Sequence, residues 1–259
     1  MNADSTAGSP SEFRQILGIR FFVGEARRAV DLLRNGGLLV VPAAPALKNV
    51  SVDIAYREAL LGADLVITDS SLMVMVWNIL QGDNIRRLSG LEYLAELLTS
   101  SEFRDLNRPF WIMANPASAS TNVKWLREQR IEVQPDDIYV APTYGAVIED
   151  ETLLERVRTR SPRHIIITLG GGTQEKLGLY LKRHLRPVPA IHCIGAAIAF
   201  LSGDQVEIPM WADRFYLGWL FRCISDPKRY VPRYWAARKL VTLMLRYRER
   251  DPLATAQLS

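Results

Sequence analysis

One aspartate in the sequence stands where a catalytic carboxylate would be expected. Asp69 follows the apolar run 65–68. A partly desolvated carboxylate at the end of a strand can act as a general base toward a hydroxyl group. The same side chain could instead cap the helix that the sequence predicts over 71–81, because aspartate is a favoured residue at helix starts. Both interpretations stay open at this point.

A run of three glycines is the second candidate. Gly170–Gly172 follow the apolar run 165–168 and precede a polar helix start. Such a junction lets backbone N–H groups and the helix dipole approach a phosphate. The spacing matches neither the dinucleotide-binding nor the P-loop pattern, so a plain tight turn is the alternative. Gln174 and Glu175 in the first turn could bind a ligand or could cap the helix.

Other catalytic arrangements are missing from the sequence. His164, His184 and His192 are scattered and lack the spacing of metal ligands, so we interpret them as structural. No GxSxG motif and no Ser–His–Asp set is evident, and no DxD pair occurs. We therefore expect no catalytic metal and no cofactor. Cys193 lies in an apolar run and is interpreted as a buried thiol rather than as half of a disulfide.

The composition is that of a globular protein. Of 259 residues, 48% are apolar and 23% are charged, and a well-buried core is expected from such a chain. Residues 1–12 are polar, lack the pattern of a signal peptide and are predicted to be a disordered tail. No apolar run approaches the ~18 residues of a membrane span. These features favour a cytoplasmic protein.

Strand and helix patterns alternate between residues 13 and 204. Continuous apolar runs of strand length occur at 13–23, 38–42, 63–70, 109–115, 136–142, 163–170 and 189–195. Amphipathic segments separate them at 24–37, 51–62, 71–81, 90–101, 122–131, 149–160 and 173–185. This alternation predicts an α/β domain with a Rossmann-like, mostly parallel sheet and helices on both faces. Asp69, Asn115 and Gly170 then fall at carboxyl ends of strands, where such sheets bind ligands.

Residues 205–259 differ from the rest, since they are both aromatic and basic. Between Arg222 and Arg250 there are nine Lys or Arg residues against two acidic ones. We predict short helices here, interrupted at Pro227 and Pro232. The basic side chains could bind phosphates while the aromatic ones lie at a bilayer interface; alternatively, this is a solvated helix with an aromatic packing face. Nucleic acid is not expected as a partner, because no known binding motif occurs.

Several separated motifs resemble one bacterial family, the WecG/TagA/CpsF group of sugar transferases (glycosyltransferase family 26). The resemblance runs from about 18 to 234. In the C-terminal part it rests on the stretches GAAIAFLSG (195–203), EIPMW (207–211), LGWLFRC (217–223), DPKRY (226–230) and RY (233–234). Upstream it rests on ADLVITDS (63–70), RLSG (87–90) and LGGGTQE (169–175), which correspond to the family's ADLVLPDG, RVTG and glycine-loop patterns.

The resemblance implies an inverting, metal-independent transfer of a sugar from a UDP-sugar to a polyprenyl-diphosphate-linked saccharide, in exopolysaccharide or surface-glycan synthesis. Asp69 is then the catalytic base. The implied substrate-binding residues are Ser70, Arg87, Gly90, Gly170, Gly171, Gly172, Thr173, Gln174 and Glu175. The residues implied to meet the acceptor or the membrane are Arg222, Lys228, Arg229 and Arg233. We accordingly expect a peripheral position on the inner face of the plasma membrane, through a helical appendage formed by 205–259. A homo-oligomer is compatible with the sequence.

The chain also departs from the family's pattern. The family's TPN sequence is replaced by Val41–Pro42–Ala43, an arginine by Glu207, and the glycine after the catalytic aspartate by Ser70. Exchanging arginine for glutamate reverses a charge that would hold phosphate. These departures leave a second hypothesis open: a catalytically decayed paralogue that binds a partner protein or a nucleotide sugar.

Overall fold

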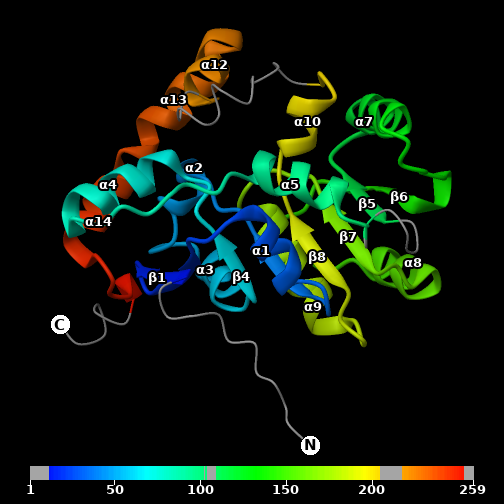
Figure 1. Ribbon diagram of the computed structural model, residues 1–259, viewed down its shortest axis with the longest axis horizontal. Helices are drawn as coiled ribbons and strands as arrows, with labels where there is room; N and C mark the ends of the chain where they lie inside the picture. The colour runs from blue at the N-terminus through cyan, green and yellow to red at the C-terminus, as the bar shows by residue number, and fades with distance from the viewer. Residues whose placement is uncertain (1–11, 102, 104–108, 205–217, 254–259) are drawn as a thin grey trace, which may run out of the picture.

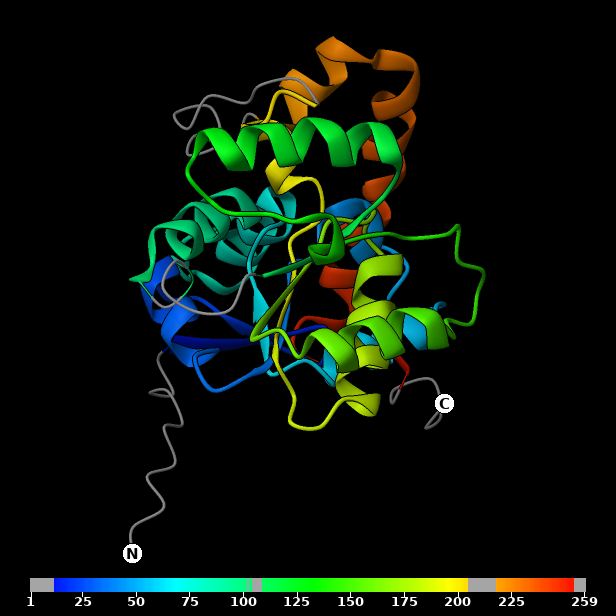
Figure 2. The same ribbon diagram turned by 90° about the vertical axis from the view of Figure 1, so that its right-hand side faces the viewer.

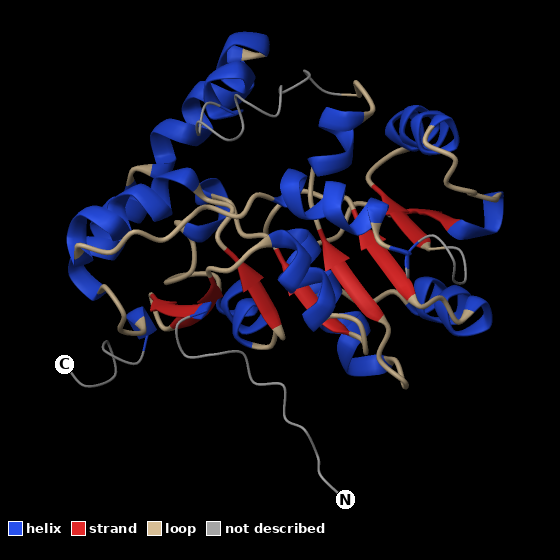
Figure 3. Cartoon of the chain, viewed as in Figure 1, coloured by secondary structure: helices blue, strands red, loops and turns tan. Residues whose placement is uncertain are grey.

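The computed structural model describes residues 12–101, 103, 109–204 and 218–253. Almost all of the predicted N-terminal tail, and the first part of the predicted appendage, lie outside these residues. Within them an α/β architecture surrounds one sheet, and a helical C-terminal part follows (Figures 1 and 3). The fold class predicted from the sequence is confirmed.

The sheet has eight strands in the order β1-β2-β4-β3-β8-β7-β5-β6. Only β1 and β2 pair antiparallel, and every other neighbouring pair is parallel. The strands are β1 (Phe13–Ile16), β2 (Ile19–Phe22), β3 (Gly37–Val40), β4 (Leu65–Ile67), β5 (Phe110–Met113), β6 (Ile138–Val140), β7 (His164–Ile167) and β8 (Ala190–Cys193). The central strands are buried on both faces, which explains their continuous apolar sequences.

Helices cover both faces of the sheet, and each face has its own core. Alternate residues of a strand point to opposite faces, so Ile165 and Ile167 contribute to one core and Ile166 to the other. The first core includes side chains from α2 (Ala44–Leu47), α3 (Ile54–Leu61), α4 (Ser71–Gln81), α8 (Glu151–Arg160) and α9 (Thr173–His184). The second includes side chains from α1 (Ala26–Leu32), α5 (Gly90–Thr99), α7 (Pro116–Glu128) and α10 (Ala197–Leu201).

The first predicted strand, 13–23, is two strands joined by a tight turn. Leu17 and Gly18 have positive φ angles of 53° and 78°, which reverse the chain and create the antiparallel pair β1–β2. Their N–H groups donate to the carbonyls of Arg248 and Glu249, at 2.7 and 2.9 Å. The C-terminal segment therefore fixes the position of this hairpin.

The described residues from 218 onward include the helices α12 (Gly218–Ser225), α13 (Pro227–Ala237) and α14 (Lys239–Tyr247). The first break falls before Pro227, as expected, but α13 continues through Pro232, so the predicted break there is wrong. The ring removes one backbone hydrogen bond, and Pro232 is exposed, so water can solvate the unpaired carbonyl. Helix α14 packs against α4 and buries Leu240 and Met244 in the first core.

The carboxyl ends of the parallel strands point toward α10, α12 and α13, as the arrowheads in Figure 1 show. The view in Figure 2 places α7 on this same side of the sheet. The chain thus places α7, α10, α12 and α13 on the side of the sheet where the sequence places Asp69 and the glycine run. Among the described residues, no helix is long and apolar enough to span a membrane.

Candidate functional site

A cavity of about 600 Å³ lies at the carboxyl ends of the central strands. Residues that follow β3, β4, β5, β7 and β8 form its floor, and α12 and α13 complete its wall. Both sequence candidates reach it, since the lining includes Asp69 and Gly170–Gly172. Asp69 and the glycine run, which are about one hundred positions apart in the chain, therefore line the same cavity.

Asp69 presents one engaged and one unengaged carboxylate oxygen. Its Oδ1 accepts from the backbone N–H of Gly90 at 3.0 Å and from Nη2 of Arg87 at 3.2 Å. Its Oδ2 accepts from no residue that the structure describes. The side chain is 21% exposed, so it is partly desolvated yet open to the cavity.

The segment Arg87–Gly90 holds this carboxylate in place. Arg87 also donates from Nε to the backbone carbonyl of Asp69 at 2.6 Å. Gly90 is the first residue of α5, so the positive end of that helix points at the carboxylate. Thr68 fixes the segment to the end of β4, because its hydroxyl donates to the carbonyl of Arg86 and accepts from the N–H of Leu88.

Ser70, not Asp69, caps the helix that follows. The Ser70 hydroxyl accepts from the N–H of Met73 at 3.2 Å at the start of α4. The interpretation of Asp69 as the cap of this helix is therefore wrong. Ser70 is buried and lies outside the cavity lining, and its hydroxyl serves local structure.

The glycine run makes a bend with some free N–H groups. The N–H groups of Thr173 and Gln174 donate to the carbonyl of Gly170 at 3.2 Å each, and that of Gly172 donates to Glu175 at 2.6 Å. In the part of the chain that the structure describes, the N–H groups of Gly170 and Gly171 have no acceptor. A phosphate or sugar oxygen at this bend would meet these two donors.

The buried side chains of Gln174 and Glu175 hold the glycine bend in place through hydrogen bonds. Gln174 is 2% exposed, and its Oε1 accepts from the N–H of Gly195 at 2.7 Å, which ties α9 to the loop after β8. Glu175 is 0% exposed and caps the start of α9 through Gly172. Burial raises the pKa of Glu175 to about 7, against the opposing effect of the Gly172 N–H. Gln174 lines the cavity, whereas Glu175 and Thr173 do not.

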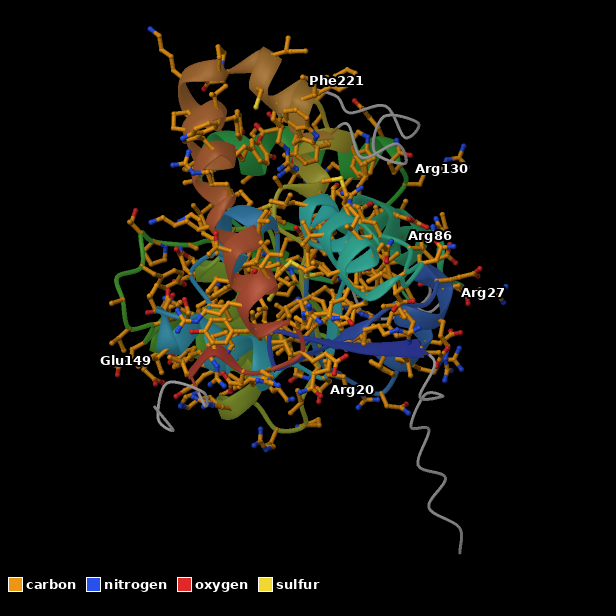
Figure 4. All side chains as sticks on the ribbon, turned by 90° about the vertical axis from the view of Figure 1, so that its left-hand side faces the viewer. Arg20, Arg27, Arg86, Arg130, Glu149 and Phe221 are labelled. Carbon is orange, nitrogen blue, oxygen red and sulfur yellow. The ribbon has the colours of Figure 1, made fainter. Side chains whose placement is uncertain are left out.

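Helices α12 and α13 bring aromatic and basic side chains to the cavity wall. Phe221, labelled in Figure 4, packs with Leu91 and Phe200 and so anchors α12 above the sheet.

Arg222 donates to the hydroxyl of Tyr234 at 3.1 Å and lies over the ring of Phe200. Its Nε is buried and bonded to no described residue. Arg233 also lines the cavity, Lys228 does not, and the side chain of Arg229 lies outside the described residues.

Three carboxylates of the described residues line the cavity, and their partners differ. Asp53 caps α3 through the N–H of Tyr56 and pairs with Lys176 at 2.8 Å. Asp204 is half-buried near the end of α10. Of these three, only Asp69 lies just beyond a strand, with Thr68 between it and β4, and accepts from the N–H of a helix start. The sequence alone did not single out Asp53 or Asp204, because neither follows a strand; Asp204 directly follows the stretch GAAIAFLSG (195–203), and that position was the signal that could have identified it.

The histidines lie elsewhere. His164 and His192 stack in the second core with Nδ1 and Nε2 3.1 Å apart, and the hydroxyl of Tyr93 lies 2.8 Å from the other ring nitrogen of His192. Burial lowers the pKa of His164 to about 4, so this pair is neutral at pH 7. Across the described residues, no group of three or more His, Cys, Asp or Glu side chains could hold a metal ion.

Comparison with known proteins matches most of the chain to one family. Residues 14–252 fit the model described as "Glycosyl transferase WecG/TagA/CpsF family". The chain is also similar to an N-acetylglucosaminyldiphosphoundecaprenol N-acetyl-beta-D-mannosaminyltransferase of Bacillus spizizenii, with 24% identity over 83% of this chain and 81% of the relative. Proteins of the same description from Bacillus subtilis and Staphylococcus aureus share 24% and 21% identity, over 70% and 75% of this chain and 71% and 75% of theirs.

Proposed function

Because the chain belongs to the WecG/TagA/CpsF family of glycosyl transferases, we propose that it moves a sugar from a UDP-sugar to a polyprenyl-diphosphate-linked saccharide, with inversion, in bacterial exopolysaccharide or surface-glycan synthesis. The relatives are described as N-acetylmannosaminyltransferases that act on a lipid-diphosphate N-acetylglucosamine. A UDP-N-acetylhexosamine and a lipid-diphosphate N-acetylglucosamine are therefore the first substrates to test.

One observation carries the proposal: Asp69 and the glycine bend face the same cavity, and Oδ2 of Asp69 accepts a hydrogen bond from none of the described residues. In the proposed reaction an acceptor hydroxyl attacks the anomeric carbon of the donor. The new bond joins the acceptor oxygen to that carbon, and the bond from the carbon to the diphosphate breaks. The acceptor proton passes to Oδ2 of Asp69, and UDP leaves.

The cavity offers separate support for a diphosphate. Gly170 and Gly171, whose N–H groups have no acceptor among the described residues, line it together with Arg222 and Arg233. Guanidinium and backbone N–H groups both stabilise negative charge that develops on a leaving phosphate. Metal independence is part of the proposal, and these groups, which could stabilise the leaving diphosphate, support it.

A non-catalytic binding role is the second candidate, and one observation favours it. Val41 and Ala43 line the cavity with apolar side chains after β3, where the resemblance leads one to expect polar ones. In that case the cavity would bind a nucleotide sugar without transferring it. The two candidates differ in a single measurable property, which is turnover.

The test compares wild type with Asp69→Asn, using UDP-N-acetylhexosamines and a lipid-diphosphate N-acetylglucosamine acceptor. Asparagine keeps the shape and the hydrogen bonds to Oδ1 but cannot accept a proton. We expect kcat to fall roughly 10²–10⁴-fold, while calorimetric affinity for UDP changes less than about twofold.

Asp204→Asn is the matched comparison, since it removes another carboxylate of the cavity wall. If sugar transfer is lost in Asp204→Asn and kept in Asp69→Asn, the assignment of Asp69 as the base is contradicted. Binding of the nucleotide sugar without any transfer by wild type would favour the non-catalytic role.

A further inference from the structure

The segment that connects α4 to α5 orients the proposed base, although it has no regular structure of its own. Residues 82–89 belong to no helix or strand. They include Arg87 and lead to Gly90, and both of these residues donate hydrogen bonds to Oδ1 of Asp69. Backbone groups outside helices and strands need other partners, such as side chains. The orientation of Asp69 therefore depends on the side chains that keep this segment in place.

Thr68 attaches the segment to the end of β4. Its hydroxyl donates to the carbonyl of Arg86 at 3.1 Å and accepts from the N–H of Leu88 at 3.0 Å. These two bonds bind the backbone on either side of Arg87. Thr68 is 0% exposed and is the residue next to Asp69 in the chain. One side chain thus links the strand end that carries the carboxylate to the backbone that orients it.

Asn78 attaches the same segment to α4. Its Nδ2 donates to the carbonyl of Ile85 at 3.0 Å, and its Oδ1 accepts from the N–H of Ile85 at 3.0 Å. A side-chain amide can bond both backbone groups of one residue in this way because it carries a donor and an acceptor. Thr68 and Asn78 therefore hold the backbone of 85–88 from two different elements.

The bonds from Thr68 are a feature of this sequence. In ADLVLPDG, the family pattern to which residues 63–70 correspond, proline stands in the place of Thr68. A proline side chain has no hydroxyl and could form neither of the two bonds. The attachment of the segment to β4 by this side chain is thus absent from the pattern on which the resemblance rests.

We propose that Thr68 and Asn78 are positioning residues for sugar transfer. They hold Arg87 and Gly90, and these two residues orient Asp69 so that its Oδ2 can accept the proton of the acceptor. Neither Thr68 nor Asn78 lines the cavity, so each acts through Asp69 and not by contact with a substrate. This role rests on the proposed function, in which Asp69 is the base.

The first experiment measures turnover, nucleotide binding and stability for Thr68→Val. Valine is close to threonine in shape and lacks the hydroxyl. With a UDP-N-acetylhexosamine and a lipid-diphosphate N-acetylglucosamine, we expect kcat to fall roughly ten- to a hundredfold, the effect of a misplaced catalytic group, while the calorimetric Kd for UDP changes less than about twofold. Thr68→Ser keeps the hydroxyl and should restore most of kcat. Asn78→Ala should reproduce the loss.

A double variant separates positioning from a purely structural role. If Thr68 acts through Asp69, its replacement should have no further effect once Asp69→Asn has removed the base. The kcat of Thr68→Val with Asp69→Asn should therefore stay within about twofold of that of Asp69→Asn alone. Two independent effects would instead multiply.

Ser100→Ala is the matched control. The Ser100 hydroxyl also donates to a carbonyl, that of Leu97 at 2.8 Å, and accepts from an N–H, that of Phe103 at 3.4 Å. It lies at the C-terminal end of α5, away from the segment that orients Asp69. Its removal should lower the melting temperature and leave kcat unchanged.

Two results would overturn the inference. One is a Thr68→Val variant that folds and has the kcat of wild type; the other is a double variant in which the two losses multiply. A different pattern, in which Asp69→Asn keeps full kcat or wild type transfers no sugar, would sink the proposed function together with this positioning role.

Discussion

At the scale of single residues, the cavity shows how environment assigns different roles to the same side chain. Asp53 has its charge balanced by Lys176 and its oxygen engaged in a helix cap. Asp69 has one oxygen engaged and one open to the cavity. A carboxylate that is oriented on one side and open on the other is suited to accept a proton.

Glu175 provides a prediction on pH. Burial raises its pKa to about 7 in the folded protein, from an ordinary 4.5. The stability contributed by the protonated form is complete below about pH 4.5 and is lost as pH rises through about 7. Glu175→Gln removes this titration, so the variant should match wild type near pH 4.5 and exceed its unfolding free energy at pH 8, by up to about 3 kcal/mol.

Denaturant unfolding of both proteins between pH 4.5 and 8 measures this difference. Glu149→Gln serves as the control, because Glu149 lies on the surface (Figure 4) and its replacement should leave the pH profile unchanged in shape. Parallel profiles for wild type and Glu175→Gln would show that Glu175 does not titrate in this range.

At the scale of elements, α12 and α13 combine two surfaces. One side lines the cavity with Arg222 and Arg233. Elsewhere these helices expose large apolar side chains, namely Trp219, Leu220, Ile224, Val231 and Trp235. Lys228 and Arg238 are exposed alongside them. Exposed aromatic and basic side chains on one short helical unit are typical of attachment to an anionic membrane surface.

This arrangement predicts the behaviour of a double variant, Ile224→Glu with Trp235→Glu. Both side chains are mostly exposed, at 71% and 69%, so the fold should be preserved. Sedimentation with vesicles that contain anionic lipid should fall at least severalfold, since two apolar contacts are lost and negative charge is added.

Val147→Glu is the control, because Val147 is 74% exposed on the loop after β6. It should sediment with vesicles as wild type does. Substitutions are preferable to deletion of 205–259, because α14 packs against α4 and contributes to the core. Unchanged sedimentation of the double variant would refute membrane attachment through these helices.

The elements that the sequence predicted well are those with long, regular patterns. Buried parallel strands such as β7 have continuous apolar sequences, and their order along the chain could be predicted. Helix α2 was missed, because its four residues are too few to show a period. Helix α7 begins at Pro116, earlier than predicted, because the segment 117–121 is rich in Ser and Thr and has weak helix propensity.

At the scale of the whole molecule, the cavity is built from segments that lie far apart in the chain, and the sequence does not show that all of them meet. Strand ends identified Asp69, Asn115 and Gly170 as neighbours in space, since carboxyl ends of parallel strands share one edge. Asp53 could not be singled out in this way, because it reaches the cavity from the start of α3. Which helix starts face the cavity is a property of three-dimensional packing and leaves no pattern in the sequence.

The C-terminal segment also acts at this scale. It covers the cavity through α12 and α13 and then returns to the sheet, where Asp251 forms an ion pair with Arg57 and the backbone of 248–249 binds the β1–β2 turn. The sequence predicted the helices but not this return. Through these contacts, the first and last described segments of the chain pack against each other in the same domain that contains the cavity.

The proposed reaction requires that the glycine bend and Asp69 hold the two ends of one nucleotide sugar. The most direct measurement is a crystal structure of the protein with a non-transferable UDP-sugar analogue. We predict the diphosphate against Gly170–Gly172 and the anomeric carbon facing Asp69, with space for an acceptor hydroxyl between them. A nucleotide bound away from this cavity, or a sugar screened from Asp69 by other side chains, would contradict the account.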